Sequence, residues 1–508
     1  MSLLNVPVFP WSRFGNCKDC FSIRSYSSCK KYFTLFFPAQ NCYTVRMSNV
    51  KYAPEEPIAA IATALAPAAL GIVRCSGKNC IELVSAVFSR PNALRAASGN
   101  TLVYGWIISG GAKIDEVMVS VYRAPKSFTG EDMIEISCHG GPGVVMAIHS
   151  LLLNSGFRQA ERGEFTFRAF INGKADLTKA EAVQEIIDSR TGESRSRAAG
   201  RLAGNLFEEI DAIKKLIIDT LASIEVEIEY PEDEETIADS FDMQNLKQAE
   251  RRLEALGSTW QGEKLYQDGA RVVLCGRTNA GKSSLFNAIL KEDRAIVSDI
   301  EGTTRDWLES WVDFDGVPVR LFDTAGLRKT DDVIEAHGVE LTKNLSQDAD
   351  VILYLADASA GLTQDDTAFL SECTEPVVFI WNKCDKTERK TPLPPITEIN
   401  PKIHAVLEIS AKNAFGFEKL YAAVKNVLTD GIPSERAQAG LGSARQKAAV
   451  EEALESVRHS ICAAQDDYTL DAVVEDLENA LNSLGEITGE VSADDVLGSI
   501  FSRFCVGK

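Results

Sequence analysis

The chain lacks the features that mark membrane-spanning and disulfide-bonded proteins. None of its apolar runs reaches the roughly 18 residues that a membrane span requires. Its 12 cysteines follow no repeating framework, and a chain of this length does not need disulfides to fold, so we expect a reducing compartment. Cys17 and Cys20 form a CxxC pair, but no second pair follows at zinc-ribbon spacing. We therefore expect no zinc site there.

Positive charge is also scarce. The 53 Lys and Arg residues face 73 Asp and Glu residues, which gives a net charge of -20. This balance argues against a protein that coats nucleic acid, because counterion release needs clustered cations. Any contact with RNA must use a local patch. With 45% hydrophobic and 25% charged residues, the composition is typical of a soluble globular protein, and the length favours two or three domains.

Residues 1–46 differ from the rest of the chain. They contain one acid, Asp19, and several cations: Arg13, Lys18, Arg24, Lys30, Lys31 and Arg46. This bias is typical of an organelle transit peptide. Dense cysteine and poor amphipathic spacing instead favour an upstream start codon, with Met47 as the first residue of the protein. We expect a cytoplasmic protein in the second case, and a mitochondrial or chloroplast protein if residues 1–46 are a transit peptide.

The next two segments differ in their hydrophobic pattern. Residues 47–172 alternate short strand-like runs with turn clusters and one or two helical stretches, which predicts an α+β domain. Residues 173–268 begin a helical domain. Within it, apolar residues recur every three or four positions from Leu202 to Ile228, and this spacing predicts an amphipathic helix. The acidic stretch 231–235 contains a proline and ends that helix as a loop.

The second half of the chain predicts an inserted domain. In residues 269–431, apolar strand-like runs alternate with helical patterns, as in a parallel sheet wrapped by helices. Residues 432–508 then return to helix. The predicted fold class is therefore multidomain, α/β plus all-α: an N-terminal α+β domain, a helical domain in two parts, and an inserted P-loop domain with a Ras-like parallel sheet.

A phosphate-binding loop opens the inserted domain. The apolar run 271–275 leads directly into residues 276–283, which read GRTNAGKS. In this GxxxxGKS spacing, backbone N–H groups at the start of a helix cradle phosphates. Lys282 would reach the β- and γ-phosphates, and Ser283 would ligate Mg²⁺. The motif predicts a nucleoside triphosphate site without choosing between ATP and GTP.

The base is selected by residues 382–385, which read NKCD and follow the apolar run 377–381. The carboxylate of Asp385 can accept two hydrogen bonds from guanine N1–H and N2–H₂. Adenine offers no such pair, and an unpaired buried acceptor costs about 1–3 kcal/mol. Residues 410–412, Ser-Ala-Lys, lie where a backbone N–H would meet the guanine O6. We therefore expect GTP.

Two further elements lie in order between the phosphate loop and the base loop. Asp323 begins the sequence DTAG and would lie beside Mg²⁺, while Thr304 ends GTT and would complete the Mg²⁺ shell with Ser283. Four matched elements in order predict a GTP-binding domain. The predicted GTP-binding residues are Asn279, Ala280, Gly281, Lys282, Ser283, Ser284, Ser298, Asp299, Ile300, Glu301, Gly302, Thr303, Thr304, Asp323, Thr324, Ala325, Gly326, Asn382, Lys383, Asp385, Ser410, Ala411 and Lys412.

The residue after DTAG is informative. Ras-type enzymes place a water-orienting Gln there, whereas this chain has Leu327. An apolar side chain cannot orient the attacking water, so either hydrolysis is very slow or another group serves. Glu335 is the nearest carboxylate suited to that role. The alternative is that Glu335 is one of a solvated acidic group with Asp331 and Asp332.

Several rare strings outside the nucleotide motifs resemble one family. They include FTGEDMIE at 128–135, CHGG at 138–141, GEFTFRAF at 163–170 and FCVGK at 504–508. Together with the nucleotide motifs, they resemble the tRNA modification GTPase family MnmE, also called TrmE, from about Ile58 to Lys508. The resemblance implies a GTPase that acts with a flavin-dependent partner similar to MnmG (GidA), which carries FAD. Together they would add an aminomethyl or carboxymethylaminomethyl group to carbon 5 of the wobble uridine (U34) of certain tRNAs.

The resemblance also implies a tetrahydrofolate derivative in the N-terminal domain. Glu135 would offer paired acceptors to the pterin, and the cations Arg74 and Lys174 would meet glutamate carboxylates. Read without the family, both cations would be assigned to the surface. The family places its C-terminal lysine, here Lys508, near this site. Cys505 lies in the same tail. Two interpretations are open: it takes part in the chemistry, or it is a small buried thiol.

The same resemblance implies how the protein assembles and that it binds a monovalent cation. Members dimerise through the folate domain, and a heterotetramer with the flavoprotein is implied, with tRNA as substrate. K⁺ would bind at Asn279, Ser298, Ile300 and Thr303. Two departures from the family pattern are Ser298, where Thr is usual, and residues 66–70, which replace a glycine-rich turn. A second functional hypothesis is a regulatory GTPase switch in ribosome assembly, which would have no need of Glu135, Lys174 and Lys508.

Overall fold

The computed structural model describes residues 56–229, 243–291, 308–323, 347–386, 396–432, 439–465 and 469–508. The predictions for residues 1–46, including the CxxC pair, and for the acidic stretch 231–235 concern residues outside these ranges. Within them, no helix is long and apolar enough to cross a membrane.

The N-terminal region is a six-stranded sheet with helices, in the strand order β3-β4-β5-β2-β1-β6. All neighbours are antiparallel except β1 and β6, which are parallel. Buried apolar side chains of the strands and of α1 and α3 form its main core. The elements are β1 (Ile58–Ile61), β2 (Leu70–Ser76), α1 (Cys80–Ala86), α2 (Pro91–Ala96), β3 (Thr101–Ser109), β4 (Ala112–Tyr122), β5 (Met133–His139), α3 (Pro142–Asn154), β6 (Arg158–Gln159) and α4 (Glu164–Ile171).

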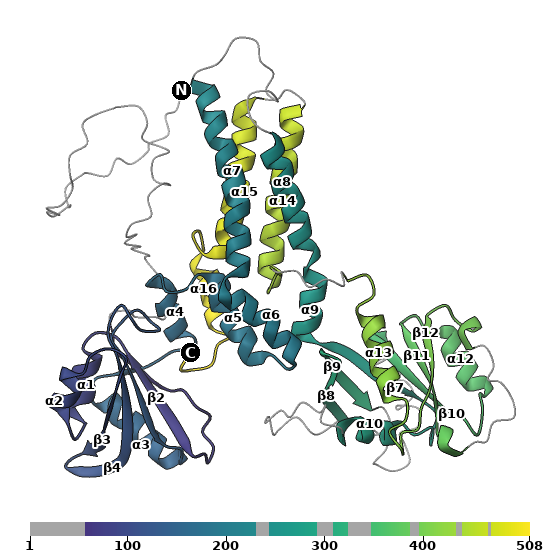
Figure 1. The fold of residues 1–508 in the computed structure, drawn as a ribbon, viewed down its shortest axis with the longest axis horizontal. Helices are drawn as coiled ribbons and strands as arrows, with labels where there is room; N and C mark the ends of the chain where they lie inside the picture. Colours follow the sequence, from purple (N-terminus) through teal and green to yellow (C-terminus); the bar gives the residue numbers. More distant parts are fainter. Residues whose placement is uncertain are drawn as a thin grey trace, which may run out of the picture. The chain divides into compact units, whose positions relative to one another are not determined.

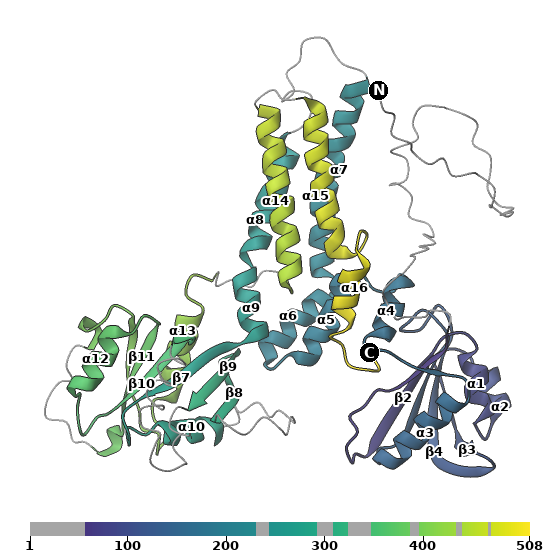
Figure 2. The same cartoon turned by 180° about the vertical axis from the view of Figure 1, so that it is seen from behind.

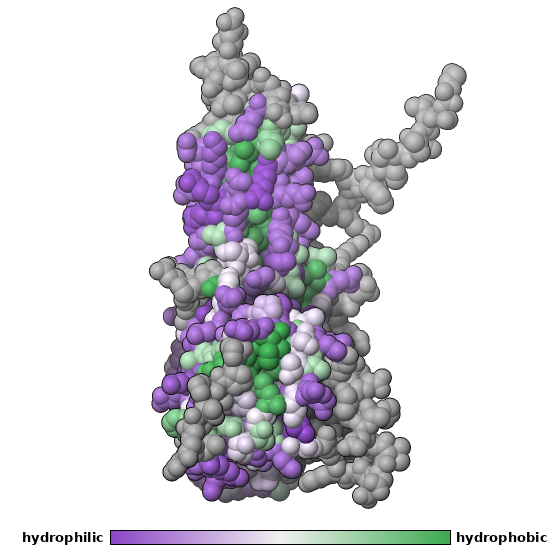
Figure 3. All heavy atoms as spheres, turned by 90° about the vertical axis from the view of Figure 1, so that its right-hand side faces the viewer, coloured by the Kyte–Doolittle hydropathy of each residue, from purple (hydrophilic) through white to green (hydrophobic). Residues whose placement is uncertain are grey.

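Helices from two distant parts of the sequence form a bundle. Figures 1 and 2 show α7, α8, α14 and α15 running side by side, and their apolar faces share one core. In the space-filling view, hydrophilic side chains cover most of the visible bundle surface (Figure 3). The helices are α5 (Leu177–Asp188), α6 (Gly192–Ala203), α7 (Asn205–Glu229), α8 (Met243–Ser258), α9 (Trp260–Asp268), α14 (Ala444–Gln465), α15 (Leu470–Thr488) and α16 (Asp494–Phe501).

The expected single helix from Leu202 to Ile228 is wrong at its start. Leu202 belongs to α6, and α7 begins only at Asn205. Between them Gly204 takes a left-handed conformation, with φ 109°, which ends α6. Leu202 is 38% exposed, whereas Leu206 and Ile210 are fully buried. The apolar spacing therefore continues across a helix boundary.

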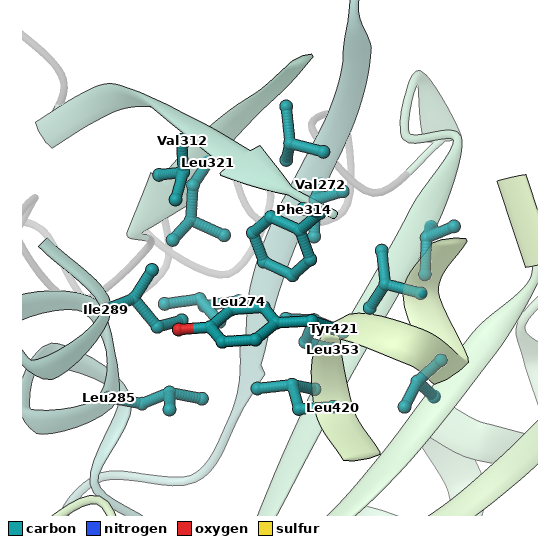
Figure 4. Packing of buried hydrophobic residues seen from close by; sticks show 14 of the residues in the cluster. Val272, Leu274, Leu285, Ile289, Val312, Phe314, Leu321, Leu353, Leu420 and Tyr421 are labelled. Carbon is teal, nitrogen blue, oxygen red and sulfur yellow. The ribbon is translucent and has the colours of Figure 1, made fainter. Parts of the chain in front are cut away.

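The inserted region is a six-stranded sheet in the order β12-β11-β10-β7-β9-β8. All pairs are parallel except that of β8 with β9. The rings of Phe314 and Tyr421 meet edge to face at 5.0 Å in the core on one side of the sheet (Figure 4). The elements are β7 (Ala270–Gly276), α10 (Lys282–Lys291), β8 (Leu308–Phe314), β9 (Val317–Asp323), β10 (Val351–Asp357), α12 (Gln364–Glu372), β11 (Val377–Asn382), the 3-10 helices η2 (Cys384–Lys386) and η3 (Ile396–Glu398), β12 (Ile403–Glu408) and α13 (Phe417–Leu428). The predicted fold class is confirmed.

The chain leaves the helical region and returns to it at neighbouring points. Helix α9 ends at Asp268 and β7 begins two residues later. After the sheet, the backbone N–H of Leu441 donates a hydrogen bond to Thr259 Oγ1 at 3.2 Å, just before α14. Strand β7, which leads into the phosphate loop and is called the P-loop strand below, is thus joined directly to the helical region.

Candidate functional site

The phosphate loop joins the central strand β7 to α10. The ammonium group of Lys282 donates hydrogen bonds to the backbone oxygens of Gly276 and Arg277 at 2.6 and 2.8 Å. Lys282 is buried, whereas Ser283 and Ser284 are exposed on the first turn of α10. The first N–H groups of this helix have no intrahelical acceptor, so its start is suited to bind phosphate.

Asn382 connects the phosphate loop to the Ser410–Lys412 loop. Its side-chain amide donates to the backbone oxygen of Ala280 at 2.9 Å, and its side-chain oxygen accepts from the backbone N–H of Ala411 at 3.1 Å. Asn382 is 1% exposed. Because both amide ends are used in a buried position, the two loops are held in fixed relation.

Lys383 makes a second connection to the phosphate loop. Both Lys383 and Asn279 have left-handed backbone conformations, with φ 64° and 63°. The Lys383 ammonium donates to the Asn279 backbone oxygen at 2.5 Å and to the Asp357 carboxylate at 2.7 Å. Burial alone would raise the pKa of Asp357, but hydrogen bonds from Lys383 and Ser359 outweigh it and lower that pKa to about 2. Asp357 is therefore a permanent anion that holds Lys383 in place.

Asp357 is not predicted from the sequence, because it lies in no motif. It ends β10 and pairs in register with Asn382 at the end of β11. Its only signal in the sequence is a carboxylate at the end of an apolar strand next to the base loop.

Asp385 lies in position to accept hydrogen bonds. The Ser410 hydroxyl donates to its carboxylate at 2.8 Å. This hydrogen bond is the main cause of a lowered pKa for Asp385. The carboxylate is exposed and anionic at neutral pH, as the recognition of two guanine N–H groups requires.

The predicted metal-binding residues lie only partly within the described ranges. Asp323 ends β9, is 4% exposed and lies in register with Leu274 of the neighbouring P-loop strand. Asp323 and Ser283 therefore offer oxygen ligands of the type that Mg²⁺ prefers. Of the residues predicted to bind K⁺, Asn279 lies within the described ranges and belongs to the phosphate loop. Several residues named in the predictions lie outside the described residues: Ser298, Asp299, Ile300, Glu301, Gly302, Thr303, Thr304, Thr324, Ala325, Gly326, Leu327 and Glu335.

A second constellation surrounds Arg74 of β2. Its guanidinium group lies 5.2 Å from the ring centre of Phe128 and 5.1 Å from that of Phe165. Its Nε lies 3.0 Å from the Glu135 carboxylate, an ion pair without hydrogen-bond geometry. The expectation from the residues alone, a surface cation, is wrong for Arg74, which is 9% exposed.

The C-terminal tail reaches this constellation. Arg74 Nη1 donates to the backbone oxygen of Gly507 at 2.9 Å. The backbone N–H of Phe165 donates to the backbone oxygen of Lys508 at 3.1 Å. Burial lowers the pKa of the Lys508 ammonium, nearby Arg74 lowers it further, and Glu135 opposes both. The structure therefore brings Arg74, Glu135 and Lys508 together, although they are far apart in the sequence.

Lys174 and Cys505 lie beside this constellation, and no side-chain hydrogen bond or ion pair joins either of them to it within the described ranges. Lys174 is exposed, and its Cγ lies close to Gly130, in the loop that carries Phe128. Asn172 donates to the Thr129 backbone oxygen at 2.7 Å, which fixes the approach of this segment to the loop. Cys505 is exposed, so its interpretation as a buried thiol is wrong.

Comparisons with known proteins cover nearly the whole described chain. A family model described as the N-terminus of the GTP-binding protein TrmE matches residues 57–174, and one described as the MnmE helical domain matches residues 177–505. The chain is 52% identical to the tRNA modification GTPase MnmE of Treponema denticola over 469 residues, 90% of this chain and 99% of the relative. The MnmE of Treponema pallidum is 44% identical over 493 residues, with the same coverage.

Solved structures give only a partial match. Era of Aquifex aeolicus, bound to GDP and AlF4⁻, is 25% identical and covers 37% of this chain and 66% of its own, with a TM-score of 0.26. The full-length relatives therefore carry the assignment. On their identity and coverage, the chain belongs to the family of tRNA modification GTPases named MnmE.

Proposed function

We propose that this chain binds GTP with Mg²⁺ and hydrolyses it as part of a tRNA modification reaction. The observation that carries the proposal is the pairing of Asp385 with Ser410 beside two loops that Asn382 and Lys383 hold together. Asp385 accepts from the guanine edge. Lys282 exchanges its loop carbonyls for phosphate oxygens, an exchange that neutralises charge on the nucleotide.

Ser283, Thr304 and Asp323 would hold the magnesium ion. When bound, Mg²⁺ supplies positive charge to the β- and γ-phosphate oxygens and so stabilises charge that develops as the γ-phosphoryl leaves. Ser283 and the buried Asp323 supply the hard oxygen donors that this ion selects. Replacing Ser283 with Ala should therefore reduce the gain in nucleotide affinity that Mg²⁺ produces.

Hydrolysis needs groups other than a Gln after the DTAG sequence. Leu327 cannot orient water, so we assign that role to Glu335. The sequence contains no identifiable arginine that would stabilise the negative charge of the transition state. We assign this role to K⁺, held by Asn279, Ser298, Ile300 and Thr303. Hydrolysis should then be much faster in KCl than in NaCl of equal concentration. Equal rates would mean that a cationic side chain supplies the charge.

The second constellation supports a role in one-carbon transfer. We propose that Glu135 accepts from the pterin of a tetrahydrofolate derivative and that Arg74, Lys174 and Lys508 meet its carboxylates. The folate would supply the carbon that, with a FAD-containing MnmG-like partner, becomes the aminomethyl or carboxymethylaminomethyl group on carbon 5 of U34. The proposed assembly is a homodimer joined to that flavoprotein in the cytoplasm.

Binding of 5-formyltetrahydrofolate tests this part of the proposal separately from the GTPase. Isothermal titration of the purified chain should show saturable binding that Glu135→Gln abolishes, while the rate of GTP hydrolysis is kept. Absence of binding with intact GTP hydrolysis would contradict the folate assignment and favour a regulatory switch in ribosome assembly.

A further inference from the structure

A cavity of about 320 Å³ lies among α5, α6, α9, the segment before α14, and α16 with the tail that follows it. Neither the nucleotide site nor the Arg74 constellation uses it. Carboxylates dominate its charged lining. The charged residues that line it are Glu181, Glu185, Asp188, Asp268, Arg201 and Arg503.

Arg201 is already engaged by two carboxylates. Its guanidinium group lies 2.6 Å from the Glu185 carboxylate and 2.6 Å from that of Glu263; the side chains of Arg201 and Glu263 are 3% and 4% exposed, and that of Glu185 is 13% exposed. Glu181 pairs with Arg445 at 2.9 Å. Asp188 accepts only a neutral hydrogen bond among those described, from the Gln184 amide at 2.9 Å. The carboxylates that line the cavity therefore outnumber the lining cations, which are Arg201 and Arg503.

Two buried amide atoms at the cavity have no hydrogen-bond partner among the described residues. They are Gln184 Oε1 on α5 and Gln267 Nε2 on α9, and both residues line the cavity. Leaving a buried polar atom without a hydrogen-bond partner is unfavourable, so native proteins rarely leave two together. A ligand that donates polar hydrogens would satisfy Gln184 Oε1.

We propose that this cavity binds a small organic cation that carries ammonium or guanidinium groups. The volume is near the lower end of ligand pockets, roughly 300–1,000 Å³, and therefore fits a diamine or an agmatine-sized molecule. The carboxylates exclude phosphate-bearing ligands. The site is independent of the proposed function and lies between the helix that enters the P-loop strand and the tail that ends at Lys508.

The titration of Glu185 gives the proposal a second readout. Burial raises the pKa of this carboxyl to about 7; Arg201 opposes the rise, while Glu181 and Glu263 add to it. A bound cation stabilises the ionised carboxylate, so binding should release a proton near neutral pH. Affinity should therefore rise as pH increases from about 6 to about 8.

The test is isothermal titration of the full-length chain with agmatine, with 1,4-butanediol as a neutral control. We expect saturable binding with a Kd below about 1 mM, heat that depends on the buffer's ionisation enthalpy, and no binding of the diol. Asp268→Asn, at an exposed position on the rim, should weaken agmatine binding about tenfold through loss of a charged hydrogen bond. Asp219→Asn, on the exposed face of α7, is the matched control.

Three results would overturn the proposal. They are absence of agmatine binding in a chain that still hydrolyses GTP, equal binding of the diol, or equal loss of affinity in Asp268→Asn and Asp219→Asn. Unchanged melting temperature and GTP hydrolysis in both variants would show that they are folded.

Discussion

The ammonium group of Lys383 lies 2.5 Å from the backbone oxygen of Asn279, on the phosphate loop. The loop of residues 382–385 and the phosphate loop are thus joined by a charged hydrogen bond between two residues in left-handed conformations. The Asp357 carboxylate accepts a hydrogen bond from the same ammonium group at 2.7 Å. The geometry of the phosphate loop therefore depends on a residue that is remote from it in the sequence.

Lys383→Met should weaken GTP binding about tenfold to a hundredfold, because it removes a charged hydrogen bond to the loop and leaves Asp357 without its cation. Binding of a fluorescent GTP analogue measures the effect. Lys386→Met removes an exposed cation from the same turn and should leave the affinity unchanged. Equal effects of the two substitutions would contradict the structural role.

Asp385→Asn should shift preference from guanine toward xanthine nucleotides. An amide donor in place of the carboxylate suits the additional carbonyl of xanthine, while guanine loses its acceptor. The measurement is the ratio of GTP to XTP affinity. An unchanged ratio would remove Asp385 from the base pocket, and Asp365→Asn on α12 serves as the control for general effects of charge.

Glu335→Ala should lower kcat and leave GTP affinity nearly unchanged, which is the signature of an interaction made chiefly in the transition state. Asp331→Ala and Asp332→Ala should have small effects. The three variants are compared under saturating K⁺. Turnover of the Glu335 variant at the parent rate would assign this residue to a solvated acidic group.

Gly507→Ala should loosen the tail. Gly507 has φ 96°, and an added Cβ would lie 2.7 Å from the backbone oxygen of Ile61, at a cost on the order of 1–3 kcal/mol. Because Arg74 binds the Gly507 carbonyl, affinity for 5-formyltetrahydrofolate should fall several-fold while GTP hydrolysis persists. Gly498→Ala, where the Cβ meets open space, should change neither quantity.

Raising the pH should destabilise the helical region through Glu185. Its pKa is about 7 in the folded chain against 4.5 for the unperturbed group, so the folded state binds more protons between these values. The stabilising contribution is complete below about pH 4.5 and is lost as pH rises through about 7. Urea unfolding at pH about 5 and about 8 should show a loss on the order of 2 kcal/mol that Glu185→Gln reduces. The same pH dependence in both proteins would contradict the assignment.

The placing of the phosphate loop, Asn382 and Asp385 at one edge of the sheet was predictable because their loops follow apolar strands directly, and parallel strands bring their carboxyl ends to one edge of the sheet. Asp357 was not predictable, since its role arises from strand register with Asn382 rather than from a motif. Arg74 and Gly507 are 433 residues apart, and no periodicity reports such a contact. Only the family resemblance placed the tail near Arg74. The break at Gly204 was hidden because apolar spacing continues through it.

The hydrogen bond between Thr259 and Leu441 joins residues 182 positions apart, and the inserted sheet lies between them. In the unfolded chain, closing a loop of that length costs conformational entropy, which grows by about 0.6 kcal/mol with each doubling of length. A folded insert removes most of that cost by holding its two ends together. Helices α14 and α15 can then pack against α7 and α8 with the entropy cost of a short connecting loop. Nucleotide that stabilises the insert should therefore speed assembly of the bundle, which makes GTP a folding ligand for helices that it does not touch.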